Sequence, residues 1–122
     1  MATTYSRTIL SGSTDGRGIK VAATSSPGTT IHTGGSSSSV LDEVWLYVVN
    51  SDTTARKLSV QWGGTTSPDD LIEITIAAES GLTLVAPGLA LKGNATPLVV
   101  KAFAATADVL IIHGYVNRAT TA

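Results

Sequence analysis

The segment 41–50, LDEVWLYVVN, constrains the fold most because it is apolar on two faces at once. Side chains along a β-strand alternate between the two faces of its sheet. One face of this strand carries Val44, Leu46 and Val48, and the opposite face carries Trp45, Tyr47 and Val49. An antiparallel sheet in a small domain usually buries only one face. The second apolar face therefore predicts a cover, and we expect that cover to be another subunit.

The face formed by Trp45, Tyr47 and Val49 is the candidate subunit interface, while the other face fills the core. The competing explanation is a cover within the chain, for which the segment 89–96 is the candidate. The next segment, 56–63, follows five turn residues, which predicts a β-hairpin with 41–50. In it, apolar residues alternate with polar ones. The apolar set is Leu58, Val60 and Trp62, and the polar set is Lys57, Ser59 and Gln61.

Nine apolar or alternating segments follow one another along the chain, separated by turn-rich stretches. They span residues 5–11, 19–24, 29–33, 41–50, 56–63, 71–76, 81–86, 98–104 and 109–116. Their spacing of about 8–12 residues is typical of a sandwich or barrel, and no segment keeps the 3.6-residue period of a long helix. We predict an all-β, two-sheet antiparallel sandwich, with jelly-roll topology favoured over immunoglobulin-like topology. Segments 98–104 and 109–116 are expected to pair.

A chain of 122 residues forms one domain, which we place at 1–122, with flexible tails at 1–4 and 118–122. The apolar alternation also predicts which side chains form the core. The predicted core consists of Val44, Leu46, Val48, Leu58, Val60, Trp62, Ile72, Ile74, Ile76, Leu84 and Phe103.

The composition excludes several classes of function. Hydrophobic residues make up 43% of the chain and charged residues only 14%. This composition indicates a globular protein whose surface is suited to contact with a partner or to packing in an assembly. The eight Lys and Arg residues are dispersed, which argues against nucleic-acid binding. Without cysteine there is no disulfide, thiol catalysis or thiolate metal site. No apolar run is long enough to cross a membrane. The first residues do not resemble a signal peptide, so we expect synthesis without export.

The two histidines, His32 and His113, each lie in a predicted strand without a second ligand or carboxylate at a useful spacing. A metal or catalytic role would need partners supplied by distant segments. We interpret both as hydrogen-bonded strand or interface residues, and we expect His113 in particular to be partly buried because it shares a face with Ile111 and Tyr115.

The carboxylates also lack a catalytic arrangement. Asp69 and Asp70 follow Pro68, where an Asx-type turn is expected. The alternative is a weak cation site completed by Asp15 or Asp42. We predict a non-enzymatic protein with no catalytic residue, no cofactor and no metal.

A carbohydrate-binding module is an alternative of another class, because such modules stack sugars on exposed rings. It predicts that Trp45 or Tyr115 lies open in a shallow groove. Strand alternation instead places Trp62 in the core and Trp45 in the core or an interface.

Several phrases of the sequence resemble small structural proteins of tailed double-stranded DNA bacteriophages. They are VWLYVVN at 44–50, QWGGTTSPDDL at 61–71, VAPG at 85–88, VVKAFAATA at 99–107 and IHGYVN at 112–117. Across residues 8–118 the chain is similar to head decoration or cement proteins. That resemblance implies a capsid-surface protein, commonly a homotrimer, which clamps neighbouring major capsid subunits after head expansion. It also implies assembly of the virion in the host cytoplasm.

One departure from this family concerns the N-terminus. Lambda-type decoration proteins have a long N-terminal arm that pairs with the capsid, whereas here only residues 1–4 precede the first predicted strand. Contact is therefore expected from sheet edges or from the loops 12–18, 34–39 and 92–96. A head–tail joining or tail structural protein is the alternative within the virion.

Overall fold

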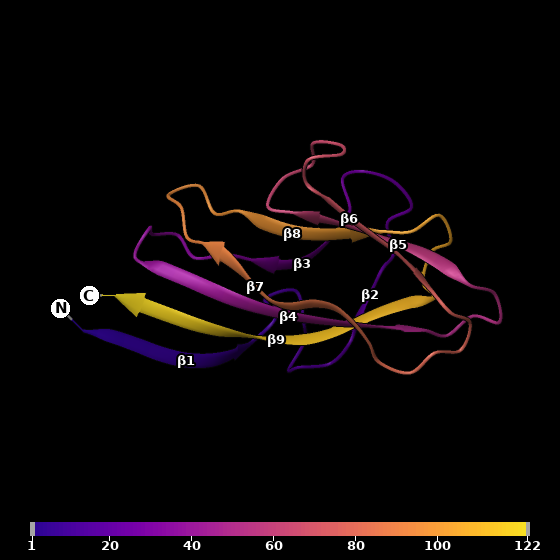
Figure 1. Ribbon diagram of the computed structural model, residues 1–122, viewed down its shortest axis with the longest axis horizontal. Coiled ribbons are helices and arrows are strands. Elements are labelled where there is room, and N and C mark those ends of the chain that lie inside the picture. The colour runs from indigo at the N-terminus through magenta and orange to yellow at the C-terminus, as the bar shows by residue number, and fades with distance from the viewer. Residues whose placement is uncertain (1, 122) are drawn as a thin grey trace.

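The computed structural model describes residues 2–121, and they form two antiparallel β-sheets packed face to face (Figure 1). The strands are β1 (Thr3–Ile9), β2 (Ile19–Lys20), β3 (Thr29–Thr33), β4 (Val40–Asn50), β5 (Arg56–Trp62), β6 (Leu71–Ile76), β7 (Thr83–Lys92), β8 (Val99–Phe103) and β9 (Leu110–Thr121). These residues include no helix, and so none that could cross a membrane. The prediction of an all-β, two-sheet sandwich is confirmed.

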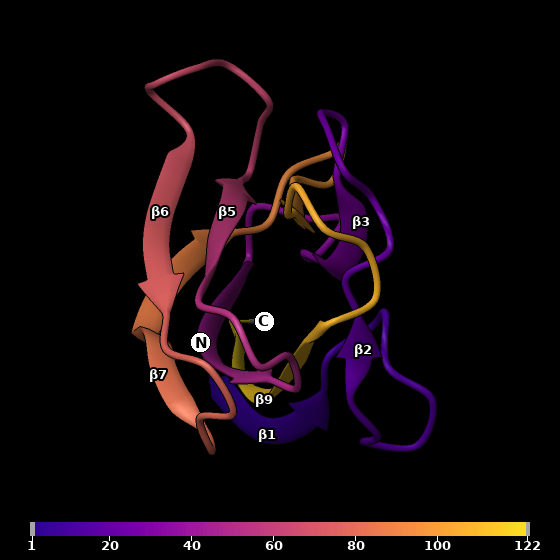
Figure 2. The same ribbon diagram turned by 90° about the vertical axis from the view of Figure 1, so that its right-hand side faces the viewer.

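The two sheets are built from nested pairs of strands. Sheet A has the order β1-β9-β4-β7, with β2 also paired to β9, and sheet B has the order β3-β8-β5-β6. The first strands pair with the last, β3 pairs with β8, β4 with β7, and β5 with β6. Figure 2 shows sheet A curving around one side of the core and sheet B lying on the other. The preference for jelly-roll topology stays a prediction.

The predicted hairpin between residues 41–50 and 56–63 is wrong, because β4 and β5 lie in opposite sheets. The Asn50 side chain organises the crossing: its amide donates to the carbonyl oxygens of Thr54 at 3.0 Å and Ile76 at 3.1 Å. The predicted pairing of 98–104 with 109–116 is also wrong, since β8 and β9 are likewise in opposite sheets. Two strands that face each other across a core bury the same alternating residues as two neighbours do, so alternation alone cannot tell these cases apart.

Most of the predicted core is confirmed. The fully buried members are Val44, Leu46, Val48, Leu58, Val60 and Ile76, and those packed against them are Trp62, Ile72 and Ile74. Leu84 is wrong: it pairs with Tyr47 on the outer face of sheet A and is 45% exposed. Phe103 is wrong too, because it pairs with Ser59 and therefore points away from the core of sheet B.

Strand β7 continues through Pro87 and Gly88, where the sequence predicts a strand end and a loop. As an edge strand, β7 tolerates a residue without a backbone N–H. Gly88 is an extra residue opposite β4, with φ of +74°, which is the geometry of a β-bulge.

The prediction of flexible tails at 1–4 and 118–122 is wrong for most of these residues, because Thr3, Thr4 and residues 118–121 belong to strands, while Ala2 precedes β1. Thr3 and Thr4 pair with Thr121 and Thr120, so both ends of the chain belong to sheet A. Met1 and Ala122 lie outside the described residues.

Candidate interaction surface

The outer face of sheet A consists of the side chains that alternate away from the core. Row by row, the paired outward residues are Tyr5, Ala119, Leu41 and Lys92; Arg7, Asn117, Glu43 and Ala90; Ile9, Tyr115, Trp45 and Pro87; His113, Tyr47 and Leu84; and Lys20, Ile111 and Val49. The predicted interface residues Trp45, Tyr47 and Val49 all lie on this face and are half-buried within the single chain. The predicted internal cover is absent, because residues 89–92 run beside β4 as part of β7.

A stack of planar groups crosses the middle of the outer face. The rings of Trp45 and Tyr115 lie 6.1 Å apart at 12°, an offset stack. The Arg7 guanidinium lies over the Tyr115 ring, 5.1 Å from its centre. Gly88 lies against the indole, where an added Cβ would approach Trp45 to 3.0 Å. Neighbouring groups of the same chain therefore contact both rings.

A hydrogen-bond network fixes the polar groups beside this stack. The Trp45 indole donates to Glu43 Oε1 at 2.8 Å, and the Asn117 amide donates to the same oxygen at 3.2 Å. These two bonds lower the pKa of Glu43 below its ordinary value. Arg7 donates to Asn117 at 3.4 Å, so the charged side chains of this row are engaged within the sheet.

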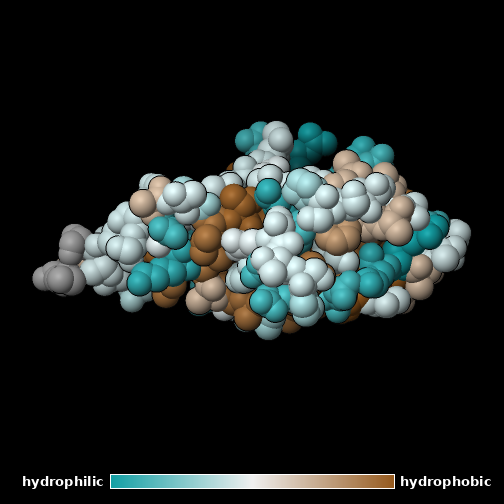
Figure 3. All heavy atoms as spheres, turned by 90° about the horizontal axis from the view of Figure 1, so that it is seen from above, coloured by the Kyte–Doolittle hydropathy of each residue, from teal (hydrophilic) through white to brown (hydrophobic). Residues whose placement is uncertain are grey.

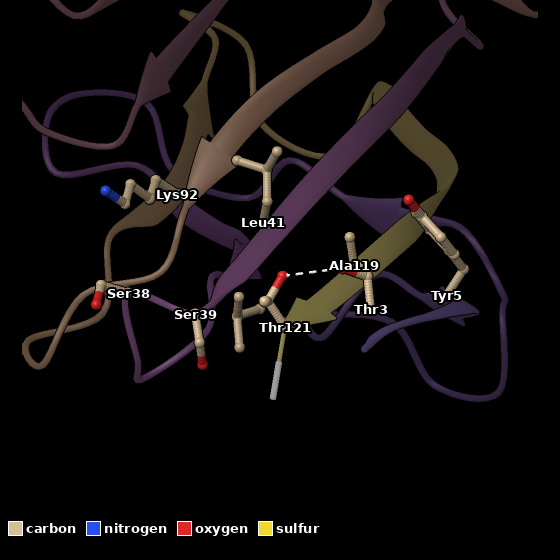
Figure 4. A pocket seen from close by; sticks show the side chains of 9 residues that line it. Thr3, Tyr5, Ser38, Ser39, Leu41, Lys92, Ala119 and Thr121 are labelled. Atoms are coloured by element: carbon tan, nitrogen blue, oxygen red, sulfur yellow. Dashed lines mark hydrogen bonds between the residues drawn. The ribbon is translucent and has the colours of Figure 1, made fainter. Parts of the chain in front are cut away.

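Three exposed apolar side chains of the outer face lie on β1 and β4, and two of them, Tyr5 and Leu41, line a hollow at one end of the face. Exposure is 78% for Tyr5, 47% for Ile9 and 46% for Leu41. Figure 4 shows Tyr5 and Leu41 on either side of β9, with the small Ala119 between them. The resulting hollow has a volume of about 830 Å³, and Ser38, Ser39 and Lys92 contribute to its lining.

Two of the three loops predicted to make contacts lie next to this hollow. The Gly93 amide donates to the carbonyl oxygen of Val40 and the Asn94 amide to that of Gly35, which joins the loops 34–39 and 92–96. Both loops lie at the end of the sandwich that carries the two termini (Figure 1). The third loop, 12–18, lies farther along β9, where Gly18 packs against Ile111 and His113.

The outer face of sheet B differs because its own chain covers it. Gln61 accepts a hydrogen bond from the Gly28 amide at 2.9 Å and donates to Ser26 Oγ at 2.8 Å. Gly28 packs so tightly on β8 that an added Cβ would lie 2.5 Å from the Ala102 carbonyl oxygen. Gln61 is consequently buried although it points away from the core. Ser59, which donates to Glu73, is buried on the same face. Seen from the sheet B side, apolar side chains form only patches among hydrophilic and neutral ones (Figure 3).

A buried polar bridge joins the two sheets. Asp42 on β4 accepts two hydrogen bonds from Arg118 on β9, at 2.7 and 2.9 Å. The Ser11 backbone N–H donates to His32 Nδ1 at 3.1 Å, which assigns the ring hydrogen to Nε2, and Nε2 donates to Asp42 at 2.8 Å. Burial alone would raise the pKa of Asp42. The hydrogen bonds from Arg118 and His32 and the guanidinium charge outweigh that effect and hold this pKa below its ordinary value.

This bridge contains the residue types of a hydrolytic triad without its geometry. Ser11 reaches His32 only through its backbone N–H, while its hydroxyl oxygen accepts a hydrogen bond from the Thr33 amide at 2.6 Å. His113 is partly buried, as predicted, but His32 is the more buried of the two histidines, which the prediction did not expect. Alternation already places Asp42 on the core face of its strand, and that was a signal for a buried carboxylate in need of partners.

Two of the aspartates considered for a cation site, Asp70 and Asp42, take part in separate contacts. Asp70 accepts a hydrogen bond at 3.1 Å from the amide of Thr66, four residues before it. An Asx-type turn uses an amide two residues after the Asp, so this bond is not the predicted turn. Asp42 belongs to the buried bridge. Within residues 2–121, no three His, Asp or Glu side chains come together as metal ligands would.

Comparison with known proteins found no match for this chain among family models, curated proteins or solved structures. Its function must therefore be argued from the surface of the molecule.

Proposed function

We propose that this protein is a non-enzymatic structural protein of a bacteriophage virion, which binds the major capsid protein through the outer face of sheet A. One observation carries the proposal: within residues 2–121, four of the six large hydrophobic side chains that are exposed lie on this face. They are Tyr5, Ile9, Leu41 and Leu84. Apolar side chains gathered on one exposed face mark an interaction site.

The two charged side chains beside the ring stack support a wide and static contact. Arg7 and Glu43 are held by hydrogen bonds and stacking within the sheet. Binding of a partner would therefore not leave these two charges desolvated without hydrogen-bonding partners. Many identical copies on a symmetric shell can each add a modest interface, and occupancy then stabilises the shell.

The nested strand pairing supports a jelly-roll assignment, in which a long antiparallel hairpin is folded over to form both sheets. Viral capsid domains and lectins both use this architecture, so it is compatible with the virion role without selecting it.

The carbohydrate-binding alternative depends on an open ring of Trp45 or Tyr115. Tyr115 is contacted by Trp45 and Arg7, and Trp45 is contacted by Tyr115 and Gly88. Neither ring offers a bare platform, which favours the protein-binding proposal.

Cosedimentation with expanded capsids that lack this protein tests the proposal. Saturable binding at a fixed number of copies per capsomer and a higher capsid melting temperature are expected. Leu41→Asp and Leu84→Asp place a charge on the outer face of sheet A and should abolish binding. Thr75→Asp places the same charge on an exposed position of β6 in sheet B and should leave it intact.

Equal binding by all three variants would show that the outer face of sheet A is not the capsid-binding surface. Binding to tails or to head–tail connectors in place of capsids would move the protein to that station. Retention on a glycan column without binding to any virion part would overturn the virion role.

A further inference from the structure

The free edge of strand β1 differs from the other edges of the two sheets. β1 pairs only with β9, and the hydrogen bonds of residues 2–121 leave its second edge open. Its seven residues run from Thr3 to Ile9 in continuous register, without proline, glycine or a bulge. An open, regular edge of this length is a template for pairing with another strand.

The other long edges carry features that block such pairing. β7 contains Pro87 and two register shifts. The edge of β3 is occupied by its own chain, because the Gly12 amide donates to the Ile31 carbonyl oxygen at 2.9 Å. β6 is six residues long and carries a charged Glu73 near its middle. Each of these features is a known protection against edge-to-edge association.

The single charge of β1 does not protect its edge. The Arg7 guanidinium lies over Tyr115 and its Nε donates to Asn117, and both partners belong to β9. Arg7 therefore turns away from the open edge. Thr4 and Ser6, which point to the sheet B side, are exposed as well, so sheet B leaves space for a further strand.

We infer that β1 pairs antiparallel with β1 of a second copy of this chain, around a two-fold axis at Ser6. In this register, Tyr5 lies opposite Arg7 of the second copy, and Thr4 lies opposite Thr8. The stack formed by Trp45, Tyr115 and Arg7 ends at the edge of the sheet, and Tyr5 of the second copy would be its next member. Tyr5 is 78% exposed and has no ring partner in its own chain.

The side chains of β1 are complementary to those of a second β1 that runs antiparallel to it. An aromatic ring opposite an arginine, and threonine opposite threonine, are favourable cross-strand pairs. No two like charges face each other in this register. The interface is isologous and closes at a dimer, in contrast to the trimer that the family resemblance implies. This self-pairing does not depend on capsid binding.

Single cysteines test the pairing directly, because the chain contains none of its own. In the proposed register the two Ser6 residues lie opposite each other, about 4.5–5.5 Å apart between Cα atoms, a separation that a disulfide can bridge. Ser6→Cys should form a covalent dimer quantitatively under mild oxidation.

Thr4→Cys is the matched control, because Thr4 is exposed on the same face of the same strand. The two copies of Thr4 would be about 13 Å apart along the strands, too far for a disulfide. Thr4→Cys and Thr8→Cys should each form no covalent dimer when oxidised alone and should cross-link when mixed. Equal cross-linking of Ser6→Cys and Thr4→Cys would overturn the proposed register.

Light scattering on the unmodified protein completes the test. A dimer that dissociates on dilution is expected. Tyr5→Ser should weaken it by about tenfold, because two symmetric ring contacts are lost, and Tyr5→Phe should retain it. A strict monomer at hundreds of micromolar, or a trimer unaffected by Tyr5→Ser, would overturn the inference. Protection of β1 only in the presence of capsids would assign the edge to a capsid strand and would overturn it as well.

Discussion

The outer faces of the two sheets are shielded from solvent by different means. Residue polarity alone would wrongly predict which of the two faces the chain itself covers. On sheet B, the polar Gln61 is buried because residues 26–28 of the same chain lie over it. On sheet A, the apolar Leu41 and Leu84 are exposed, and Trp45 is sheltered only by its neighbours in the sheet. A cover supplied by the same chain can be polar, whereas the face of sheet A that the described chain leaves uncovered keeps its apolar side chains.

The largest expected effect comes from breaking the bridge that holds the two sheets together. Asp42→Asn leaves Arg118 without its countercharge, and removal of one member of a buried pair costs roughly 3–5 kcal/mol. Because Arg118 is partly exposed, we expect the lower end of this range. Urea unfolding measures the loss. Asp52→Asn, which removes a more accessible partner of Arg56, is the control and should cost less than about 1 kcal/mol.

The same bridge predicts a loss of stability in acid. The pKa of Asp42 is lower in the folded protein than in the unfolded chain, so its contribution is fully present above about pH 4. That contribution is lost as the pH falls through the folded-state pKa. The difference in unfolding free energy between wild type and Asp42→Asn should therefore shrink below pH 4. A difference that stays constant down to pH 2 would contradict this assignment.

A substitution at Gly28 would break the cover of sheet B. Gly28→Ala places a Cβ against the backbone of Ala102, and overpacking of this kind typically costs about 1–3 kcal/mol. Faster hydrogen exchange in β5 should accompany the loss. Gly81→Ala is the matched control, because an added Cβ there meets nothing within 4 Å. Equal effects of the two changes would mean that the cover does not stabilise sheet B.

The smallest effects on stability are expected on the outer face of sheet A. Leu41→Ser and Leu84→Ser remove exposed apolar side chains, so the free energy of unfolding should change by less than about 0.5 kcal/mol. Thermal melts of the purified variants measure this. A loss above about 2 kcal/mol would show that these side chains stabilise the folded chain itself, as the buried Gln61 does on sheet B.

Alternation along single strands predicted the number of strands, their approximate positions and which way β4 faces, but it missed that β7 continues to Lys92 and β9 to Thr121. It placed Val44 in the core and Trp45 on the opposite face, as the structure has them. Strand partners could not be predicted, because β4 finds its neighbours β7 and β9 far along the chain. Leu84 was misplaced for that reason, since its direction depends on two register shifts against β4.

The candidate surface was predictable only in part. Trp45, Tyr47 and Val49 follow from alternation, but the hollow depends on the small Ala119 lying between Tyr5 and Leu41 on three different strands. The buried bridge has the same limit: Asp42 faces inward by alternation, yet Arg118, its partner, lies 76 residues away. Contacts of this range are set by topology and not by local pattern.

The nested order of the strands also sets the time at which each sheet can form. β5 and β6 are close in sequence and can pair as soon as both are synthesised. In sheet A, β4 and β7 can pair earlier, but β1 and β2 pair only with β9 and must wait for this last strand. Pulsed hydrogen exchange during refolding should show β6 amides protected before those of β1. During synthesis on the ribosome, β1 therefore remains a single unpaired strand while about 100 further residues are added before β9 begins at Leu110.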